Sequence, residues 1–361
     1  MRFYALELYA PQENTQSVSV GVTLPTYQGP QSSMPNKNYI SYPSKPTKVW
    51  TSYPNGEYDP KAQNIIFDIL TFDSGLASSV YTITVEGVSF HDIQQHSNFR
   101  NYGLRLYAGM GPGLPLSNNQ PAPGIVAQGY VKEAIGRWQG TEMTVTFVVV
   151  PDIFDLESPG NLVFVWSPGQ SFANAISSTL DIAYPNFTKK IMVSDNLSTP
   201  GKVVHYASNF MSLALFIKEL TKKNINSSYS GVSMYIQNGD IFVTDESTFE
   251  SRETIQLKYD DLIGQPVWAE AGKIDIFTMM RADISVANNV KMPVVLMSVP
   301  GLVVENPSIE NTAYNYELSF FGKFLVNSIR QIGNFRMDNA NAWCSVIRCA
   351  AEVAVTNASS Q

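Results

Sequence analysis

The chain has 361 residues and a formal net charge of −7 at pH 7. That acidic balance argues against tight, sequence-independent binding of nucleic acid, which needs a basic face. Charged residues make up only 15% of the chain, against about 25% in an average globular protein. Tyrosine and phenylalanine number 18 and 19. This composition is typical of a β-rich protein with broad contact surfaces and argues against a free monomeric enzyme.

Residues 1–58 are rich in Pro, Ser, Asn and Tyr and have little periodicity. Such sequence predicts an extended, turn-broken N-terminal arm rather than a domain. The first residues, MRFYALELYAPQEN, carry one basic residue and an apolar run interrupted by Glu7, which is not the pattern of a signal peptide. No stretch approaches the ~20 apolar residues of a membrane-spanning helix. We therefore expect no membrane span and synthesis in the cytoplasm.

Residues 59–165 predict a first β-domain. The segments NIIFDILTF and SVYTITVEGVSF are alternating or continuous runs of apolar and β-branched residues, which is the pattern of strands. Two further strands, in IVAQGYVKEAIGRW and TEMTVTFVVV, follow a loop dense in Gly and Pro. Strands joined by turns, without a good helix between them, predict an antiparallel barrel or sandwich.

Residues 166–250 change to a mixed pattern. Apolar residues at every fourth position from Phe172 predict an amphipathic helix over 171–184. The segment NFMSLALFIKELTKKN predicts a second helix over 209–224, with lysines near its C-terminal end. A hairpin follows, because Asn238–Gly239 between two apolar runs is the signal of a type I′ turn. We therefore expect a small α/β insert.

Residues 251–361 return to β-sequence and predict a second β-domain. A weak internal repeat connects it to the first: Ile135–Trp138 is matched by Ile332–Phe335, and a long apolar strand follows each. The fold class is therefore mainly β with a small α/β insert, with two similar β-domains flanking that insert.

No constellation for catalysis or metal binding stands out. In HDIQQH, His91 and His96 are five residues apart, in a strand that ends in a turn, whereas helical zinc pairs are four apart. GMGPGLP lacks the Lys–Ser/Thr ending of a phosphate loop. The adjacent Asp260 and Asp261 could serve as acid and base, but the sequence favours a solvated turn. We expect no cofactor, no metal and no enzymatic activity.

The tryptophans are better explained as core or interface anchors than as a platform for a sugar. Trp138, Trp268 and Trp343, together with Gly264 and Pro266 in a turn, are the candidate interface residues. The two cysteines, five residues apart, fall on opposite faces of a regular strand, so we expect no disulfide between them.

Several stretches together resemble the baseplate hub proteins of contractile phage tails and the hub half of type VI secretion spike proteins. They are WTSYPNGEYDPKAQNIIFDI, LRLYAGMGPGLP with GYVKEAIGRWQGTEMTVTF, DLIGQPVW, and MRADISVANNVKMP followed by FGKFLVNSIRQIGNFRMDNANAWCSVI. They cover most of residues 50–350, and the order of the elements is more specific than any one motif.

The resemblance implies a homotrimer in which each chain contributes two tube-like antiparallel β-barrel domains, giving a pseudo-sixfold ring. Such a ring adapts a six-fold tail tube, or a distal tail protein, to a three-fold central spike. DNA and the tape-measure protein pass through its lumen. The location implied is the tail baseplate of the virion, assembled in the host cytoplasm. Because little sequence follows the second β-domain, we expect the spike to be a separate protein.

A ring of this kind hides strand edges by continuing one sheet into the next. The net charge predicts a polar to acidic lumen, with the basic residues on the outer face and on the insert. Two alternatives remain open. A receptor- or glycan-binding tail protein could use the same barrels as a lectin-like module. A cell-wall hydrolase would need two carboxylates about 5–10 Å apart, and no catalytic motif supports it.

Overall fold

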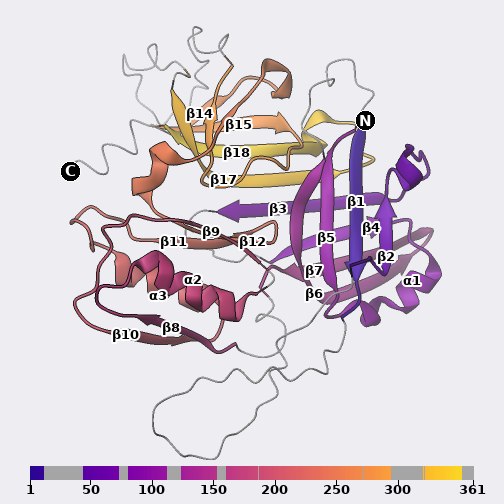
Figure 1. Cartoon of the computed structure of the whole chain (residues 1–361). Helices are drawn as coiled ribbons and strands as arrows, with labels where there is room; N and C mark the ends of the chain where they lie inside the picture. The colour runs from indigo at the N-terminus through magenta and orange to yellow at the C-terminus, as the bar shows by residue number, and fades with distance from the viewer. Residues whose placement is uncertain are drawn as a thin grey trace, which may run out of the picture.

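The computed structural model describes residues 1–11, 44–72, 80–111, 123–152, 160–185, 187–270, 272–293, 320 and 322–351. Its strands form three sheets, and the largest has thirteen strands (Figure 1). This sheet carries two groups of strands, which we name the first and the second β-unit, with the α/β insert between them in the chain. The protein is thus mainly β, as its composition and alternation patterns predict.

The first β-unit precedes the insert in the chain. Its elements are β1 (Arg2–Tyr9), β2 (Lys48–Thr51), β3 (Asn64–Phe72), β4 (Tyr81–Glu86), α1 (Phe90–Gln94), β5 (Gly103–Met110), β6 (Gly124–Gln139) and β7 (Glu142–Val150), with the 3₁₀ turns η1 (Pro54–Gly56) and η2 (His96–Phe99).

The second β-unit follows the insert. Its elements are β13 (Thr254–Gln256), β14 (Val267–Glu270), β15 (Lys273–Met279), β16 (Asn289–Lys291), β17 (Lys323–Asn334) and β18 (Trp343–Ala351), with the 3₁₀ turns η4 (Glu246–Ser251), η5 (Tyr259–Asp261) and η7 (Ala340–Ala342).

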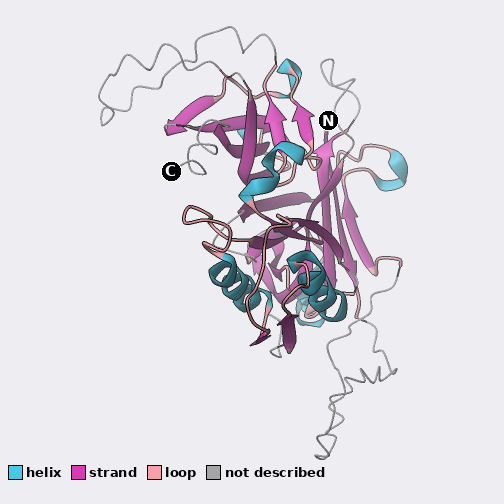
Figure 2. Ribbon diagram, turned by 60° about the vertical axis from the view of Figure 1, so that its left-hand side comes forward, coloured by secondary structure: helices cyan, strands magenta, loops and turns pink. Residues whose placement is uncertain are grey.

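The insert carries the two long helices and two small sheets, and Figure 2 shows both helices on the same side of the molecule. Its elements are β8 (Leu162–Trp166), α2 (Phe172–Ala183), β9 (Thr188–Met192), β10 (Val203–Ala207), α3 (Phe210–Thr221), β11 (Ser233–Gln237) and β12 (Asp240–Thr244).

Both predicted helices are confirmed. Ser171 caps α2 by accepting a hydrogen bond from the backbone of Asn174, and Asn209 does the same for α3. The predicted hairpin is also confirmed, because β11 and β12 pair around a turn in which Asn238 and Gly239 both have positive φ, 53° and 84°. No helix in the described ranges is both long and apolar enough to cross a membrane.

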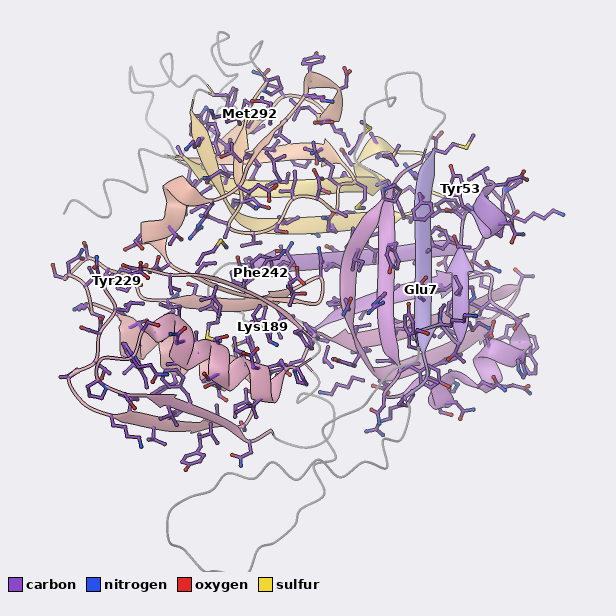
Figure 3. The ribbon with its side chains drawn as sticks, in the orientation of Figure 1. Glu7, Tyr53, Lys189, Tyr229, Phe242 and Met292 are labelled. Atoms are coloured by element: carbon purple, nitrogen blue, oxygen red, sulfur yellow. The ribbon has the colours of Figure 1, made fainter. Side chains whose placement is uncertain are left out.

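Three hydrophobic clusters support this arrangement. The first fills the first β-unit and takes in Phe335 and Trp343 from the second. The second lies inside the insert, around Trp166 and the apolar faces of α2 and α3. The third fills the second β-unit and takes in Tyr235 and Phe242 from the insert hairpin. In the first and third clusters, side chains from two neighbouring parts of the chain therefore pack together. Figure 3 shows Phe242 where the insert meets the second β-unit.

Two details differ from what the sequence predicts. Residues 90–94, expected as a strand ending in a turn, form the helix α1. Ser89 and Asp92 explain this, because their side chains and backbone amides cap each other reciprocally. The second difference concerns the expected N-terminal arm, because its two described ends are strands: β1 pairs with β2 and β5 inside the large sheet. Residues 12–43 of that segment lie outside the described residues.

The β-units also differ from the expected pair of closed barrels. The described strands of both units join into one sheet that runs from β14 at one end to β2 at the other. Neither end strand has a strand partner on its outer side among the residues described. What the structure establishes is therefore a large antiparallel sheet built from two units.

Candidate functional site

The large sheet repeats the same strand order twice. In the first β-unit the order is β3-β4-β7-β6, and in the second it is β14-β15-β18-β17. All neighbours in both runs are antiparallel, and β5 and β16 attach to β6 and β17 in the same way. The two runs have the same order along the chain as well. The internal repeat predicted from short sequence matches is therefore confirmed at the level of strand order.

A β-bulge marks equivalent positions in the two units. In the hairpin of β6 and β7 the register shifts between Val131 and Glu133, so Lys132 is the extra residue. In the hairpin of β17 and β18 it shifts between Val326 and Ser328, so Asn327 is extra. Bulges fix the register and the local twist of a strand pair. Residue n of β6 is therefore equivalent to residue n + 195 of β17.

The bulge corrects the alignment predicted from the sequence. That alignment matched Ile135 with Ile332, but the bulge makes Ile135 equivalent to Arg330. The two alignments differ by two residues, so the same faces of the strands are still matched.

The two units join directly within the chain. Ser328–Asn334 of β17 pairs antiparallel with Ile66–Phe72 of β3. Arg330 donates two hydrogen bonds to Asp68 across this junction, at 2.8 and 2.5 Å. The junction makes a continuous run of eight strands, from β14 to β6, out of two four-stranded repeats.

One face of this eight-strand run turns away from the hydrophobic clusters, and we name it the second face. Alternation places polar residues there: in β7, Val145 and Phe147 are buried, whereas Thr144 and Thr146 lie on the second face. Thr146 is hydrogen-bonded to Thr84 of β4 at 2.9 Å. The neighbouring strands β4 and β7 therefore place hydroxyl groups on this face, which contact water and polar chains without holding a charge.

The arginines described on the central strands of the second face are paired with carboxylates. Arg330 binds Asp68, and Arg348 of β18 binds Asp275 of β15 through two hydrogen bonds of 2.8 Å. In each pair the carboxylate raises the pKa of the arginine through hydrogen bonds and charge. The pairs are solvent-exposed, so they contribute little stability. Their main consequence is that these guanidinium groups carry no uncompensated positive charge.

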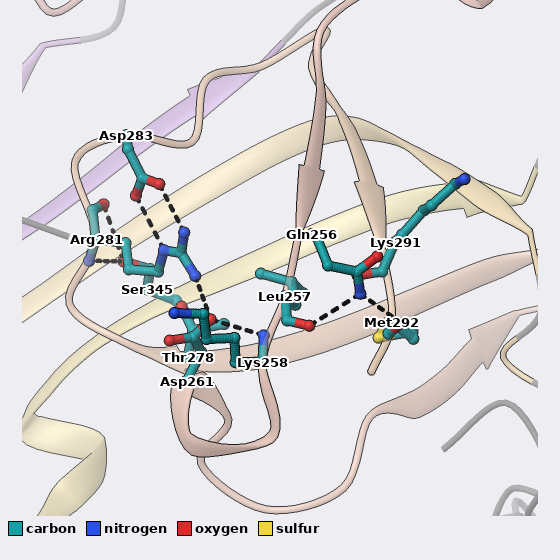
Figure 4. Close-up of polar contacts among 10 residues, drawn as sticks. All are labelled: Gln256, Leu257, Lys258, Asp261, Thr278, Arg281, Asp283, Lys291, Met292 and Ser345. Atoms are coloured by element: carbon teal, nitrogen blue, oxygen red, sulfur yellow. Dashed lines mark hydrogen bonds and ion pairs between the residues drawn. The ribbon is translucent and has the colours of Figure 1, made fainter. Parts of the chain in front are cut away.

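A buried polar cluster lies at one end of the second β-unit (Figure 4). Arg281 donates to Asp261 at 2.6 Å and to both oxygens of Asp283, at 2.9 and 2.6 Å. Its backbone amide donates to Ser345, and its carbonyl accepts from Gln331. The cluster ties the loop after β15 to η5 and to β17 and β18, which is a structural role.

Trp138, a predicted interface residue, is near the end of β6 and is 60% exposed. Its ring meets Phe90 of α1 edge to face, with centroids 5.4 Å apart, and its indole nitrogen donates to the carbonyl of Gly140. Phe90 is 46% exposed. Large apolar side chains that remain exposed together mark a contact surface more often than isolated ones do.

The other predicted interface residues lie at or near β14 and in the junction between the units. Gly264 is exposed in a turn with φ of 80°, and Pro266 is buried just before β14. Trp268 is half-buried and stacks on Phe320 with centroids 5.7 Å apart. Trp343 is only 2% exposed, because it packs between the units and donates to the carbonyl of Gly109 at 2.9 Å.

The described histidines do not gather. His96 is hydrogen-bonded to the carbonyl of Ile93, and the ring of His205 stacks on Phe216. Within the described ranges there is no group of three or more metal-ligating side chains. Cys344 and Cys349 are both free and buried, in agreement with the predicted absence of a disulfide.

Comparison with known proteins gave no matching family model and no matching curated protein. Among solved structures, the chain is similar to the c3393 protein of E. coli, a component of the type VI secretion system. The identity is 8%, the TM-score is 0.45, and the match covers 80% of this chain and 73% of the other.

Two tail proteins are also similar. One is the 43 kDa tail protein of prophage MuSo2 from Shewanella oneidensis, at 9% identity and a TM-score of 0.46, with 85% and 95% of the two chains covered. The other is a tail protein from Neisseria meningitidis MC58, at 10% identity and a TM-score of 0.44, with 83% and 95% covered.

Sequence reasoning missed the features that organise the site. The Arg281 cluster joins residues far apart in the chain, and the junction of β3 with β17 joins residues about 260 positions apart. The one usable signal was the pair of Ile-Gly motifs in β6 and β17, which lies close to the equivalent bulges.

Proposed function

We propose that this chain is a structural hub subunit of a phage-tail baseplate, and that three copies form a ring with pseudo-sixfold symmetry. The observation that carries the proposal is the repeat of one four-stranded run within a single sheet. Because each chain holds two equivalent wall units, three chains present six. Such a ring matches a six-fold tail tube on one side and a three-fold spike on the other.

The second face supports a role as the wall of a channel. Its threonines offer water-like contacts, and Arg330 and Arg348 on it are neutralised by carboxylates. A wall with free cations would hold phosphates by releasing their counterions. A neutral to acidic wall instead lets DNA and a tape-measure protein slide past.

The partners that follow from this role are the tail tube or distal tail protein, a separate spike protein and the tape-measure protein. DNA passes only transiently. The place of action is the baseplate of the virion tail, after assembly in the host cytoplasm. The role is structural rather than enzymatic, and no cofactor is part of it.

The domain boundaries proposed with this role are an N-terminal segment over 1–58, wall domains over 59–165 and 251–361, and an insert over 166–250. The insert lies outside the ring. The sequence stretches that resemble baseplate hub proteins fall mainly in the two wall domains and support this division.

Multi-angle light scattering after size-exclusion chromatography tests the proposal. We expect the mass of a trimer, and negative-stain images of the same fraction should show a ring with six lobes. A monomer at all protein concentrations, or a compact trimer without a central opening, would contradict the proposal.

A second function, receptor or glycan binding by the tail, is favoured by one observation. The ribbon of β8 and β10 exposes Tyr206 to 67%, Val204 to 48% and Val163 to 38%. Val163 pairs with Tyr206, so these side chains share one face. An exposed tyrosine on a flat ribbon can stack on a sugar ring. A glycan array would favour this function if it detected binding that Tyr206→Ala abolished.

A further inference from the structure

The junction inside the chain is a template for a junction between copies. Where the second β-unit meets the first, Ser328–Asn334 of β17 receives β3 as a neighbour. The bulge makes Glu133–Gln139 of β6 the equivalent stretch of the first β-unit. On the corresponding side of this stretch no strand pairs with β6 within the described residues, because β5 reaches only to Tyr130.

The exposure of this β6 segment agrees with a missing neighbour. Trp138 is 60% exposed, while Gly333, its equivalent in the covered strand β17, is buried. The helix α1 and the turn η2 lie on the core-facing side of β6, where a side chain at Gly136 would meet Ile93 and His96. An open strand edge next to exposed apolar side chains is a site for strand addition.

The complementary edge is β14. It pairs with β15 as β3 pairs with β4, so β14 is the equivalent of β3 in the second β-unit. On its outer side no described strand pairs with it. Among the described residues, each copy therefore has an unmatched edge of each kind, which is the arrangement that a head-to-tail ring needs.

We propose that β6 of one copy pairs antiparallel with β14 of the next copy, so that the eight-strand run continues from chain to chain. This inference rests on the proposed ring and names the surfaces that close it. The internal junction pairs Asp68 with Ile332. The strand pairings make Val267 of β14 the equivalent of Asp68 and Arg137 of β6 the equivalent of Ile332. The pair expected between two copies is therefore Val267 opposite Arg137.

The transferred register satisfies the alternation of the sheet. The same transfer places Trp268 opposite Gly136, and both lie on the core-facing side of their strands. Arg137 and Val267 then both lie on the second face. A register shifted by one residue would turn the core-facing side of one strand to the polar side of the other.

Cysteine crosslinking tests this pairing in the full chain. The test variant is Arg137→Cys/Val267→Cys. The Cα atoms of directly opposite residues in antiparallel strands are about 4.5–5.5 Å apart, so the two thiols can form a disulfide. The matched control is Arg137→Cys/Glu270→Cys, which moves one thiol three residues along β14, about 10 Å away. Burial raises the pKa of the thiols of Cys344 and Cys349, so the native cysteines compete little.

We expect mild oxidation to give covalent dimers and trimers of the test variant on non-reducing gels, at least tenfold more than in the control or in either single variant. A trimer by light scattering without this crosslink would overturn the register and leave the proposed ring standing. A monomer without crosslinks would overturn both. Equal crosslinking of the test and control variants would show random collision and would also overturn the inference.

Discussion

At the scale of single residues, Arg281 decides whether the loop after β15 stays closed on η5. Arg281 is 5% exposed and Asp261 is 2% exposed, so the carboxylate has little water to replace a lost partner. We expect Arg281→Met to lower the free energy of unfolding by about 3–5 kcal/mol, because it leaves a buried charge unpaired. Urea unfolding at neutral pH measures the change.

The matched control for this variant is Arg348→Met, which removes the exposed pair with Asp275. The expected loss there is about 0–1 kcal/mol, because water screens and solvates both groups. Equal losses in the two variants would show that burial of the Arg281 cluster contributes no more than surface charge does.

Asp92 gives the protein a pH dependence that can be worked out from its contacts. Burial raises the pKa of its carboxyl group, but hydrogen bonds and charge from Lys48 and Ser89 outweigh this, and the folded pKa lies below the ordinary 3.8. A lowered folded pKa stabilises the protein above the unfolded pKa, and the contribution disappears as the pH falls through the folded pKa.

We therefore expect Asp92→Asn to lower the free energy of unfolding at neutral pH by about 1–3 kcal/mol. The difference from the wild type should shrink as the pH falls below 3.8. Urea unfolding at several pH values measures this, with the exposed Asp195→Asn as the control. A difference that stayed constant down to acid pH would show that the carboxylate acts only through its shape.

Trp138 and Trp343 show how much of an interface can be predicted from single residues of the sequence. Trp138, chosen as an anchor, is exposed beside Phe90 at an open strand edge. Trp343, chosen for the same reason, packs inside the chain. The two have the same chemistry, so only the strand pairing decides which of them lies at an edge.

At the scale of elements, local signals were sufficient wherever the element is local. Helices α2 and α3 begin at capping residues that the sequence displays, and the Asn-Gly turn fixes the hairpin of β11 and β12. The strand β1 was not predicted, because its partners β2 and β5 are about 40 and 100 residues away. α1 was missed because five helical residues are too few to show a period.

The hairpin turn of the insert offers a test at this scale. Gly239 has φ of 84°, and a Cβ atom there would lie 2.4 Å from the amide nitrogen of Gln128 in β6. We expect Gly239→Ala to lower the free energy of unfolding by about 1–2 kcal/mol, from the left-handed backbone alone. Thermal unfolding followed by circular dichroism measures it.

Gly201→Ala is the matched control, because that glycine lacks a positive φ and has no atom within 4 Å of the added carbon. We expect the control to change stability by less than about 0.5 kcal/mol. A variant at Gly239 that is as stable as this control would mean that the turn relaxes without loss and does not fix the hairpin against β6.

At the scale of the whole molecule, the repeated sheet was visible in the sequence only as faint similarity. Two Ile-Gly motifs and two long apolar strands indicated related β-regions, and the strand order agrees. The pairing of β3 with β17 could not be predicted from the sequence. The alternation of apolar and polar residues in each strand fits many possible neighbours equally well. This joining is also what turns two β-units into one continuous wall.

The charge pattern of that wall leads to the last prediction. Arg330 and Arg348 are held by carboxylates on the second face, and on the insert Lys189 and Lys190 pair with Asp181 and Asp240. We expect no binding of labelled duplex DNA by fluorescence anisotropy at about 50 mM salt, because the net charge of −7 repels phosphates and the carboxylates already neutralise Arg330 and Arg348.

The variant Asp68→Asn/Asp275→Asn frees Arg330 and Arg348 on the second face without adding a positive residue. We expect it to bind the same DNA, with an affinity that falls as salt rises. A plot of the logarithm of the binding constant against the logarithm of the salt concentration should have a slope of about −0.9 for each phosphate neutralised. Salt-sensitive binding by the wild-type protein would contradict the passive wall and indicate a protein that grips DNA. Failure of the variant to bind would show that the second face is not accessible to DNA, which would count against its role as the lining of a channel.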